Sequence, residues 1–195
     1  MKLVLATKNS GKVVEFRRIL AEFGGNDLDV VGLDSYPEIG DIAETGATFE
    51  ENALLKARTI CKLTNLPALA DDSGICVTAL NGAPGLYSAR YSGAGDAANN
   101  QKLLAELRDV PDDQRSAYFI CVAAYVRPDG FEQIAEGRFH GKILHEVRGT
   151  GGFGYDPLFQ PEGFDCSSAE LSAQEKDAIS HRGKAMRAIA PVIIG

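Results

Sequence analysis

In the first third of the chain, the pattern of apolar and polar residues predicts one strand followed by two helices. An apolar run within residues 2–7 predicts a short buried strand, and a polar turn follows it. A helix is predicted next from apolar side chains at helical spacing, ended by Gly24-Gly25; these side chains are Val13, Phe16, Ile19, Leu20 and Phe23. A second helix is predicted after Thr48, because Thr48 and Glu51 fit a capping box. Its apolar side consists of Ala53, Ala57, Ile60 and Cys61.

The middle of the chain predicts mainly strands. Residues 68–70 and 75–80 are two strand-like runs on either side of an acidic turn. Residues 117–126 are apolar at both alternations, which predicts a central strand buried on both faces. After a Pro-Asp-Gly turn, residues 131–139 and 142–147 predict a meander whose two strands are separated by a glycine.

Further helices complete the pattern. Asp96 is placed to cap a helix whose apolar residues are Leu103, Leu104 and Leu107. Ser172 and Glu175 fit a second capping box, which opens a short helix. Residues 183–194 are helical again after a break at His181-Arg182. The sequence therefore predicts an α/β protein with a mixed β-sheet and helices packed on it.

Composition narrows the class of protein. With 195 residues, 45% of them hydrophobic, the chain can bury a core as one domain or as two closely packed lobes. A net charge of -7 argues against nucleic acid or an anionic membrane as the main partner, because both need a basic surface. No segment approaches the roughly 20 apolar residues that span a bilayer, and the N-terminal apolar run is too short for a signal peptide, so a cytoplasmic protein is expected. The cysteines are widely spaced, which favours reduced thiols; they are Cys61, Cys76, Cys121 and Cys166.

Two adjacent carboxylates, Asp71 and Asp72, end an apolar run just before Ser73-Gly74. Neighbouring side chains on a strand point to opposite faces, but we expect the bend at Ser73-Gly74 to turn both acids toward one cleft. One or two carboxylates and substrate phosphates are enough to hold magnesium, and Glu44 before the second helix is a further candidate ligand. Taken alone, the pair is better explained by an Asx-turn, in which an aspartate only bonds the following backbone.

Residues 7–12, with the sequence Thr-Lys-Asn-Ser-Gly-Lys, lie between a predicted strand and a predicted helix. The first amide hydrogens of a helix point at whatever lies before it, so this loop is a candidate phosphate site. It is not a Walker A loop, because Ala6 stands where the first glycine belongs and Val13 replaces the metal-binding Ser or Thr. An ordinary helix cap with solvated lysines is the alternative.

Three other features carry candidate chemistry. Lys56 lies on the polar side of the second helix, where a solvated lysine is the ordinary interpretation. Phe153 and Tyr155 stand among glycines, and an aromatic face stacked on a nucleobase contributes about 1–3 kcal/mol, although both rings can equally pack in the core. His181 and Arg182 can donate hydrogen bonds to a base carbonyl or a phosphate, or form a surface cap. Together with the acids and the loop, these features describe a nucleoside triphosphate pocket.

Six motifs stand in one order along nearly the whole chain. They are residues 7–12; Glu44-Thr45-Gly46 with Phe49, Glu51-Asn52-Ala53 and Lys56-Ala57; Asp71-Asp72-Ser73-Gly74; Gly82-Ala83-Pro84-Gly85 with Ser88-Ala89-Arg90-Tyr91; Gly151-Gly152-Phe153-Gly154-Tyr155-Asp156-Pro157; and Ser180-His181-Arg182-Gly183. This arrangement resembles the inosine triphosphatase-like family, the dITP/XTP pyrophosphatases. The region that matches least is residues 127–147.

The resemblance implies one domain over residues 1–195, with two lobes around a long central mixed sheet and a nucleotide cleft between the lobes. It implies magnesium-dependent hydrolysis of ITP, dITP and XTP to the monophosphate and pyrophosphate. It also implies a homodimer that clears deaminated purine nucleotides in the cytosol. No nucleic acid or membrane partner is expected.

Roles for individual residues follow as hypotheses. Asp72 is expected to be the general base and a metal ligand, with Asp71 and Glu44 completing or orienting the magnesium site. The lysines are expected to neutralise the triphosphate, and donors near the keto oxygen of the base are expected to favour ITP over ATP, with Asp156 holding the loop or a cation. The full set of expected substrate-binding residues is Thr7, Lys8, Asn9, Ser10, Gly11, Lys12, Lys56, Ser73, Phe153, Gly154, Tyr155, Asp156, Lys176, His181 and Arg182.

Three rival hypotheses stay open on the sequence alone. One is a related pyrophosphatase for modified pyrimidine or methylated nucleotides. Another is a non-enzymatic module that binds the triphosphate and signals through a dimer interface, although the intact acids argue against it. In the third, the metal and phosphate groups are structural and no turnover occurs.

Overall fold

The structure is a computed structural model that describes residues 1–23 and 28–195. The expected helix end at Gly24-Gly25 lies outside the described residues. The chain divides into two compact units. The first consists of Met1–Asp72, Cys121–Gly137 and Arg182–Gly195, and the second of Ser73–Ile120 and Arg138–His181. Across the described ranges, no helix has the length and apolar character that crossing a membrane requires.

The strands form a six-stranded mixed sheet in the order β2-β1-β3-β4-β5-β6. Strand β1 pairs in parallel with β2 and with β3, whereas β5 and β6 pair antiparallel. The strands are β1 (Lys2–Leu5), β2 (Asp29–Val31), β3 (Ala68–Val77), β4 (Ser116–Val126), β5 (Glu132–Ile143) and β6 (Phe159–Pro161). The predicted α/β class and mixed sheet are confirmed, and β4 lies at the centre with nearly every residue buried, as its unbroken apolar pattern predicts.

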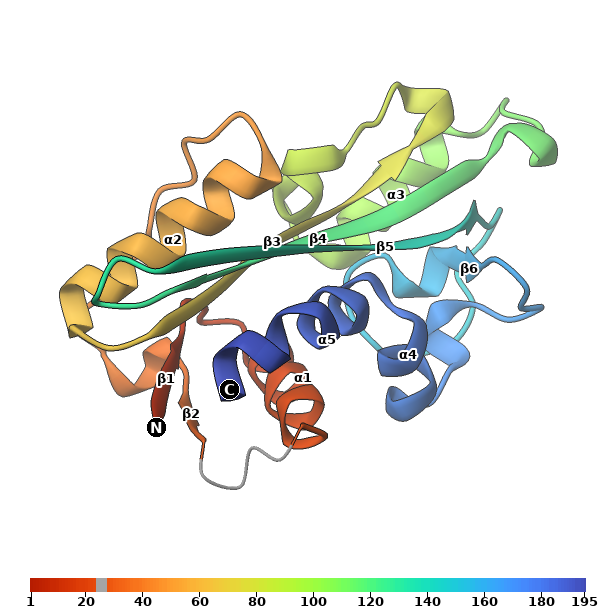
Figure 1. The fold of residues 1–195 in the computed structure, drawn as a ribbon. Helices are drawn as coiled ribbons and strands as arrows, with labels where there is room; N and C mark the ends of the chain where they lie inside the picture. The colour runs from red at the N-terminus through yellow and green to blue at the C-terminus, as the bar shows by residue number, and fades with distance from the viewer. Residues whose placement is uncertain (24–27) are drawn as a thin grey trace. The chain divides into compact units, whose positions relative to one another are not determined.

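In the first unit, helices cover both faces of β1 and of the start of β3. Helix α2 (Phe49–Thr64) lies on one face, and α1 (Ser10–Ala21) lies with α5 (His181–Ile194) on the other (Figure 1). The core between the strands and the α1–α5 pair includes Leu3, Leu5, Phe16, Leu69, Met186 and Ile189. Burial on both faces explains why β1 reads as a continuous apolar run rather than an alternating one.

The second unit contains α3 (Asp96–Glu106) and α4 (Ala173–Ile179). Its core joins α3 to β-strand residues and to the segment after the glycine-rich loop, through Ile75, Leu103, Phe119, Tyr155, Leu158 and Phe159. Within the described residues of both units, the short 3₁₀ helices are η2 (Leu33–Ser35), η3 (Thr78–Leu80), η4 (Gly85–Arg90), η5 (Asp112–Gln114), η6 (Asp156–Leu158) and η7 (Ser168–Glu170).

The predicted helix starts are largely confirmed. The Thr48 hydroxyl accepts a hydrogen bond from the Glu51 amide at the start of α2. Ser172 and Glu175 form both halves of a capping box at α4. Two details differ: the capping residue of α3 is Gly95 rather than Asp96, and the break before α5 lies at Ser180, because His181 already belongs to the helix.

The predicted turn at Ser73-Gly74 is wrong, because β3 runs without interruption from Ala68 to Val77. Gly74 is required here by a close approach and not by a bend. A Cβ atom at this position would lie 2.3 Å from the carbonyl oxygen of Gly85 and 2.7 Å from the Ser88 hydroxyl. The partners lie more than ten residues away, so local sequence does not reveal them.

The second predicted meander strand, over residues 142–147, is also wrong. Strand β5 continues through Gly141 to Ile143, and the neighbouring strand is β6. A Cβ atom on Gly141 would lie 2.2 Å from the Gln160 carbonyl oxygen. As at Gly74, the glycine marks a close backbone approach that resembles a turn signal in the sequence.

Candidate functional site

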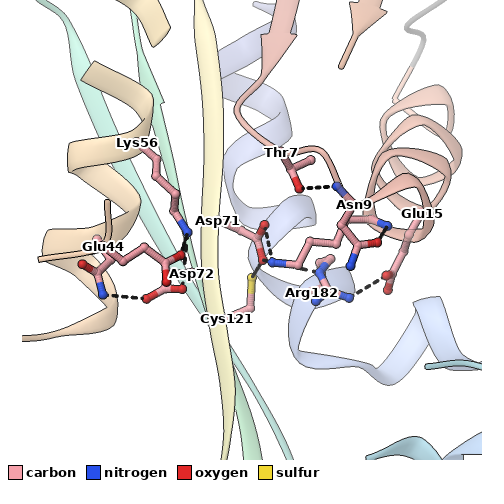
Figure 2. A network of polar contacts seen from close by, with 11 residues as sticks. Thr7, Asn9, Glu15, Glu44, Lys56, Asp71, Asp72, Cys121 and Arg182 are labelled. Atoms are coloured by element: carbon pink, nitrogen blue, oxygen red, sulfur yellow. Dashed lines mark hydrogen bonds and ion pairs between the residues drawn. The ribbon is translucent and has the colours of Figure 1, made fainter. Parts of the chain in front are cut away.

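The two adjacent aspartates lie on opposite faces of β3. Because that strand is regular, Asp71 follows Leu69 toward α1 and α5, whereas Asp72 projects toward α2 (Figure 2). The expectation that both acids turn toward one cleft is therefore wrong. Among residues 1–23 and 28–195, no group of three His, Cys, Asp or Glu side chains is placed to hold a metal, so the expected set of Glu44, Asp71 and Asp72 does not assemble.

The Asp72 face is a small polar centre with two acids and one lysine. The Lys56 ammonium lies 2.7 Å from Glu44 Oε1 and 3.3 Å from Asp72 Oδ1. Asn52 donates from its amide nitrogen to Asp72 Oδ2 at 3.1 Å. Asn52, Lys56 and Asp72 are buried, and Glu44 is half-buried. The lysine thus shares its positive charge between the two carboxylates (Figure 2).

The pKa of the Asp72 carboxyl is raised, first by burial and then by the Glu44 carboxylate, against the opposing effects of Lys56 and Asn52. Burial alone lowers the pKa of Lys56, but Asp71, Asp72 and Glu44 together raise it. Lys56 is therefore a firmly charged ammonium, and Asp72 is a more basic carboxylate than an exposed aspartate. This combination suits a proton acceptor beside a fixed positive charge.

Helix α2 positions this centre. Asn52 and Lys56 are four residues apart and so share one face of the helix. The Asn52 side-chain oxygen also accepts from the Gly46 amide at 2.8 Å, which fixes the segment just after Glu44 to the helix. Asn52 has no role in the sequence-based interpretation, and its spacing from Lys56 is the signal that identifies it.

The Asp71 face is a buried chain of alternating charges. Lys12 donates to both carboxylate oxygens of Asp71, at 3.0 and 2.9 Å, and Arg182 Nε lies 3.6 Å from Asp71 Oδ2. Arg182 Nη1 in turn lies 2.6 Å from Glu15 Oε2. The Cys121 thiol is 3.9 Å from the Asp71 carboxylate. Because α1, β3 and α5 each contribute, the chain of charges joins three elements of the first unit (Figure 2).

These buried charges stabilise one another. Burial alone raises the pKa of Asp71, but Lys12, Arg182 and Lys56 bring it well below its usual range. Burial lowers the pKa of Arg182, and Glu15 and Asp71 more than reverse that effect. Arg182, expected to face a ligand, is instead 2% exposed and held by two carboxylates. The sequence-based interpretation gives Glu15 no role. The signal in the sequence that could have identified it is its position next to Phe16, on the apolar side of α1, where an acid needs a buried partner.

The loop of residues 7–12 forms a capped helix start. The Asn9 side chain accepts from the Lys12 amide at 3.1 Å, and the Asn9 amide donates to the Thr7 hydroxyl at 3.1 Å. Lys8 is exposed and pairs with Asp41 at 2.9 Å. Ser10 begins α1, so its amide and that of Gly11 lie in the first turn, where helix amides and the helix dipole favour an anion.

In the second unit, Asp156 organises the aromatic loop. Its Oδ2 accepts from the Phe153 amide at 2.8 Å and lies 2.6 Å from the Lys176 ammonium. Lys176 also lies 5.0 Å from the centre of the Phe153 ring. Lys176, expected to neutralise phosphates, is thus held by Asp156 against the aromatic ring.

The two loop aromatics differ in exposure. Tyr155 is 4% exposed, packs in the core, and donates from its hydroxyl to the Ser88 carbonyl at 2.8 Å. Phe153 is 36% exposed and belongs to the surface. His181 is buried and stacks on Phe119, with ring centres 4.8 Å apart and an interplanar angle of 11°. Ser73, directly after Asp72, is half-buried on β3.

The fold and these side chains define an α/β protein with a carboxylate and lysine centre on one face of β3 and, in the same unit, a helix start suited to an anion. The chain belongs to the Ham1 family, whose model matches residues 3–192. It is 55% identical to the dITP/XTP pyrophosphatase of Streptomyces coelicolor over 98% of this chain and 96% of that protein. The dITP/XTP pyrophosphatase of Corynebacterium efficiens is 51% identical, over 99% and 97% of the two chains.

Solved structures give the same result. A HAM1 protein from Coxiella burnetii is 43% identical and superimposes with a TM-score of 0.88, covering 99% of this chain and 98% of that one. A nucleoside-triphosphatase or dITP/XTP pyrophosphatase from Mycobacterium abscessus is 47% identical with a TM-score of 0.78, covering 99% and 100%. Family membership therefore rests on both sequence and fold.

Proposed function

We propose that this protein hydrolyses nonstandard purine nucleoside triphosphates, namely ITP, dITP and XTP, to the monophosphate and pyrophosphate. Such an activity removes deaminated purines from the nucleotide pool. The observation that carries the proposal is the Asp72, Lys56 and Glu44 centre, in a chain 55% identical to a protein named for this activity.

Magnesium is the proposed cofactor, held by Asp72 and Glu44. Both are hard oxygen donors, and the ammonium of Lys56, which lies close to both, supports a preference for positive charge at this position. When bound, magnesium would supply charge neutralisation of phosphate oxygens and a lowered pKa for water. Asp71 is left out of this revised set, because Lys12 and Arg182 occupy its carboxylate.

Asp72 is the proposed general base. Its carboxylate accepts the proton of the attacking water as the water oxygen bonds to the α-phosphorus and the bond to pyrophosphate breaks. Asn52 donates to Asp72 Oδ2 and Lys56 donates to Asp72 Oδ1, so the two donors together fix the orientation of the carboxylate. The raised pKa of Asp72 makes the transfer more favourable than it would be for an exposed aspartate.

The start of α1 is the proposed phosphate site. The amides of Ser10 and Gly11 supply donors in the first turn, Thr7 and Asn9 hold the loop, and Lys12 and Lys8 supply charge. The Lys12 side chain is 18% exposed, so part of it is open to solvent beside the start of α1. Arg182 acts indirectly in this proposal, because it shares Asp71 with Lys12.

The second unit is proposed to recognise the base. The exposed Phe153 ring stacks on it, and Gly154, Tyr155, Asp156 and Lys176 hold the surrounding loop. Donors from this loop and from His181 favour the keto oxygen of ITP, because the amino group of ATP leaves them unpaired. Ser73 is assigned to the substrate as the neighbour of Asp72.

The proposal further includes a homodimer working in the cytosol, as the family resemblance implies. Light scattering on the purified protein tests the dimer directly. A monomer at the concentrations used for the assay would contradict that part and leave the proposed activity unaffected.

The decisive experiment measures pyrophosphate and monophosphate release from ITP, XTP, GTP and ATP, each with magnesium and with a chelator. Metal-dependent pyrophosphate release that favours ITP and XTP is expected. Tight binding without turnover would support the sensor hypothesis instead. Release of orthophosphate would place the attack at the γ-phosphorus and contradict the proposed reaction.

A further inference from the structure

Both backbone polar groups of one loop residue, Gly154, are held by a single helix. The Gly154 amide donates to Asp96 Oδ2 at 2.8 Å, and the Asn100 side-chain nitrogen donates to the Gly154 carbonyl at 3.0 Å. Asp96 and Asn100 are four residues apart and therefore share one face of α3. The carboxylate of Asp96 thus accepts from the Gly154 amide, and one helical turn later the Asn100 side chain donates to the Gly154 carbonyl.

Gly154 is one of three glycines in the segment 149–154 with a positive φ, and it directly follows Phe153. It has a φ of +63°, and glycine has the largest backbone freedom of any residue. Its neighbours are already anchored, because Tyr155 donates to the Ser88 carbonyl and the Phe153 amide donates to Asp156. Rotation at Gly154 would therefore move the exposed Phe153 ring relative to these anchors.

Packing alone explains Asn100 poorly. The side chain is buried, and its Oδ1 has no hydrogen-bond partner among the residues that the structure describes. Leaving a carbonyl oxygen buried and unpaired costs stability, which an apolar residue at this position would avoid. Asp96 is exposed, so its contact with Gly154 adds little burial. The presence of Asp96 and Asn100 is better explained by their hydrogen bonds to Gly154, which restrain the aromatic loop.

We propose that Asp96 and Asn100 are positioning residues for base selectivity. They fix the two peptide groups that flank Gly154, and through them the Phe153 ring and the loop amides, in the arrangement that distinguishes a keto purine from an amino purine. The inference rests on the proposed function, since it assumes that this loop contacts the base. It adds residues of α3 that act on the base only through the loop.

The test compares kcat/KM for ITP and for ATP in four variants. Asn100→Asp keeps the shape of the side chain but replaces the donor with a second acceptor, and Asp96→Ala removes the acceptor at an exposed position. Asp96→Asn keeps an oxygen that can accept from Gly154 and serves as the rescue variant. Gln101→Ala changes an exposed amide next to Asn100 and is the matched control.

Loss of one hydrogen bond to the loop is expected to lower the ratio of ITP to ATP kcat/KM by about tenfold in Asn100→Asp and in Asp96→Ala. Asp96→Asn and Gln101→Ala are expected to keep the wild-type ratio. An equal fall for both nucleotides, or an unchanged ratio in Asp96→Ala, would overturn the positioning role. Should Asn100→Asp fail to fold, the exposed Asp96 variants decide the question alone.

The same data separate this proposal from the proposed function. A wild-type enzyme that prefers ITP, with the same preference in every variant, would contradict only the positioning role. A wild-type enzyme with no preference for ITP would contradict the proposed function and this inference together.

Discussion

Asp71 and Asp72 are consecutive residues with opposite surroundings. Asp71 is in contact with two cations and lies within the chain of alternating charges that runs from Lys12 to Glu15. Asp72 shares one lysine with a second acid and is held by the Asn52 amide. The pKa of Asp71 is lowered by its cations, whereas the pKa of Asp72 is raised by burial and by Glu44. Adjacency on a strand thus places two carboxylates in different electrostatic surroundings.

The difference teaches how one strand can serve stability and chemistry at the same point. A carboxylate whose charge is fully balanced is a fixed structural anion, and removing it leaves its cations unpaired. A carboxylate with an unbalanced, partly desolvated environment is adaptable and can exchange a proton or accept a metal. Substitutions on either face test this distinction.

The largest expected effect is on catalysis at Asp72. Asp72→Asn should lower kcat about 10³-fold, because the amide cannot accept the proton of water. Nucleotide binding, measured by calorimetry, and the midpoint of thermal unfolding should change little. Turnover near the wild-type rate would rule out Asp72 as the general base.

Next in size is the effect of Asp71→Asn on stability. Neutralising this buried anion leaves Lys12 and Arg182 without their shared partner and should lower the free energy of unfolding by about 3–5 kcal/mol. Urea unfolding monitored by circular dichroism measures it. A stability loss as small as that of Asp72→Asn would remove the contrast between the two faces.

A smaller loss is expected at the end of the same chain of charges. Glu15→Gln removes a buried partner of Arg182 and should cost about 1.5–3 kcal/mol of unfolding free energy. The exposed pair of Arg58 and Glu132, 2.7 Å apart against 2.6 Å for Arg182 and Glu15, is the matched control. Glu132→Gln should cost at most about 1 kcal/mol, because surface ion pairs contribute little. If Glu15→Gln and Glu132→Gln lowered the unfolding free energy equally, the buried charges would contribute no more to stability than a surface ion pair.

The smallest effect is expected at Asn52. Asn52→Ala removes the hydrogen bond to Asp72 and should lower kcat about fivefold, in line with roughly 1 kcal/mol for one hydrogen bond. Steady-state kinetics with ITP measure the change, and Thr59→Ala on the same helix is the comparison. A fall in KM without a fall in kcat would place Asn52 in substrate binding instead.

The sequence by itself determined the α/β class, the buried central strand, the helix caps at Thr48 and Ser172, and the presence of acids and lysines suited to a nucleotide. Each depends on periodicity or on hydrogen bonds within a few residues, which local sequence specifies. The order of motifs added the family resemblance, which the match over residues 3–192 confirms.

Only the tertiary structure decided on which face of β3 Asp71 and Asp72 each lie, and which charged side chains form ion pairs. Gly74 and Gly141 signal turns in the sequence, yet each accommodates a backbone from a distant segment. The partner of Glu15 is Arg182, 167 residues away, and the partner of Lys12 is Asp71, 59 residues away. Side-chain direction on a strand is fixed by its regularity, and that regularity depends on neighbours that only folding brings together.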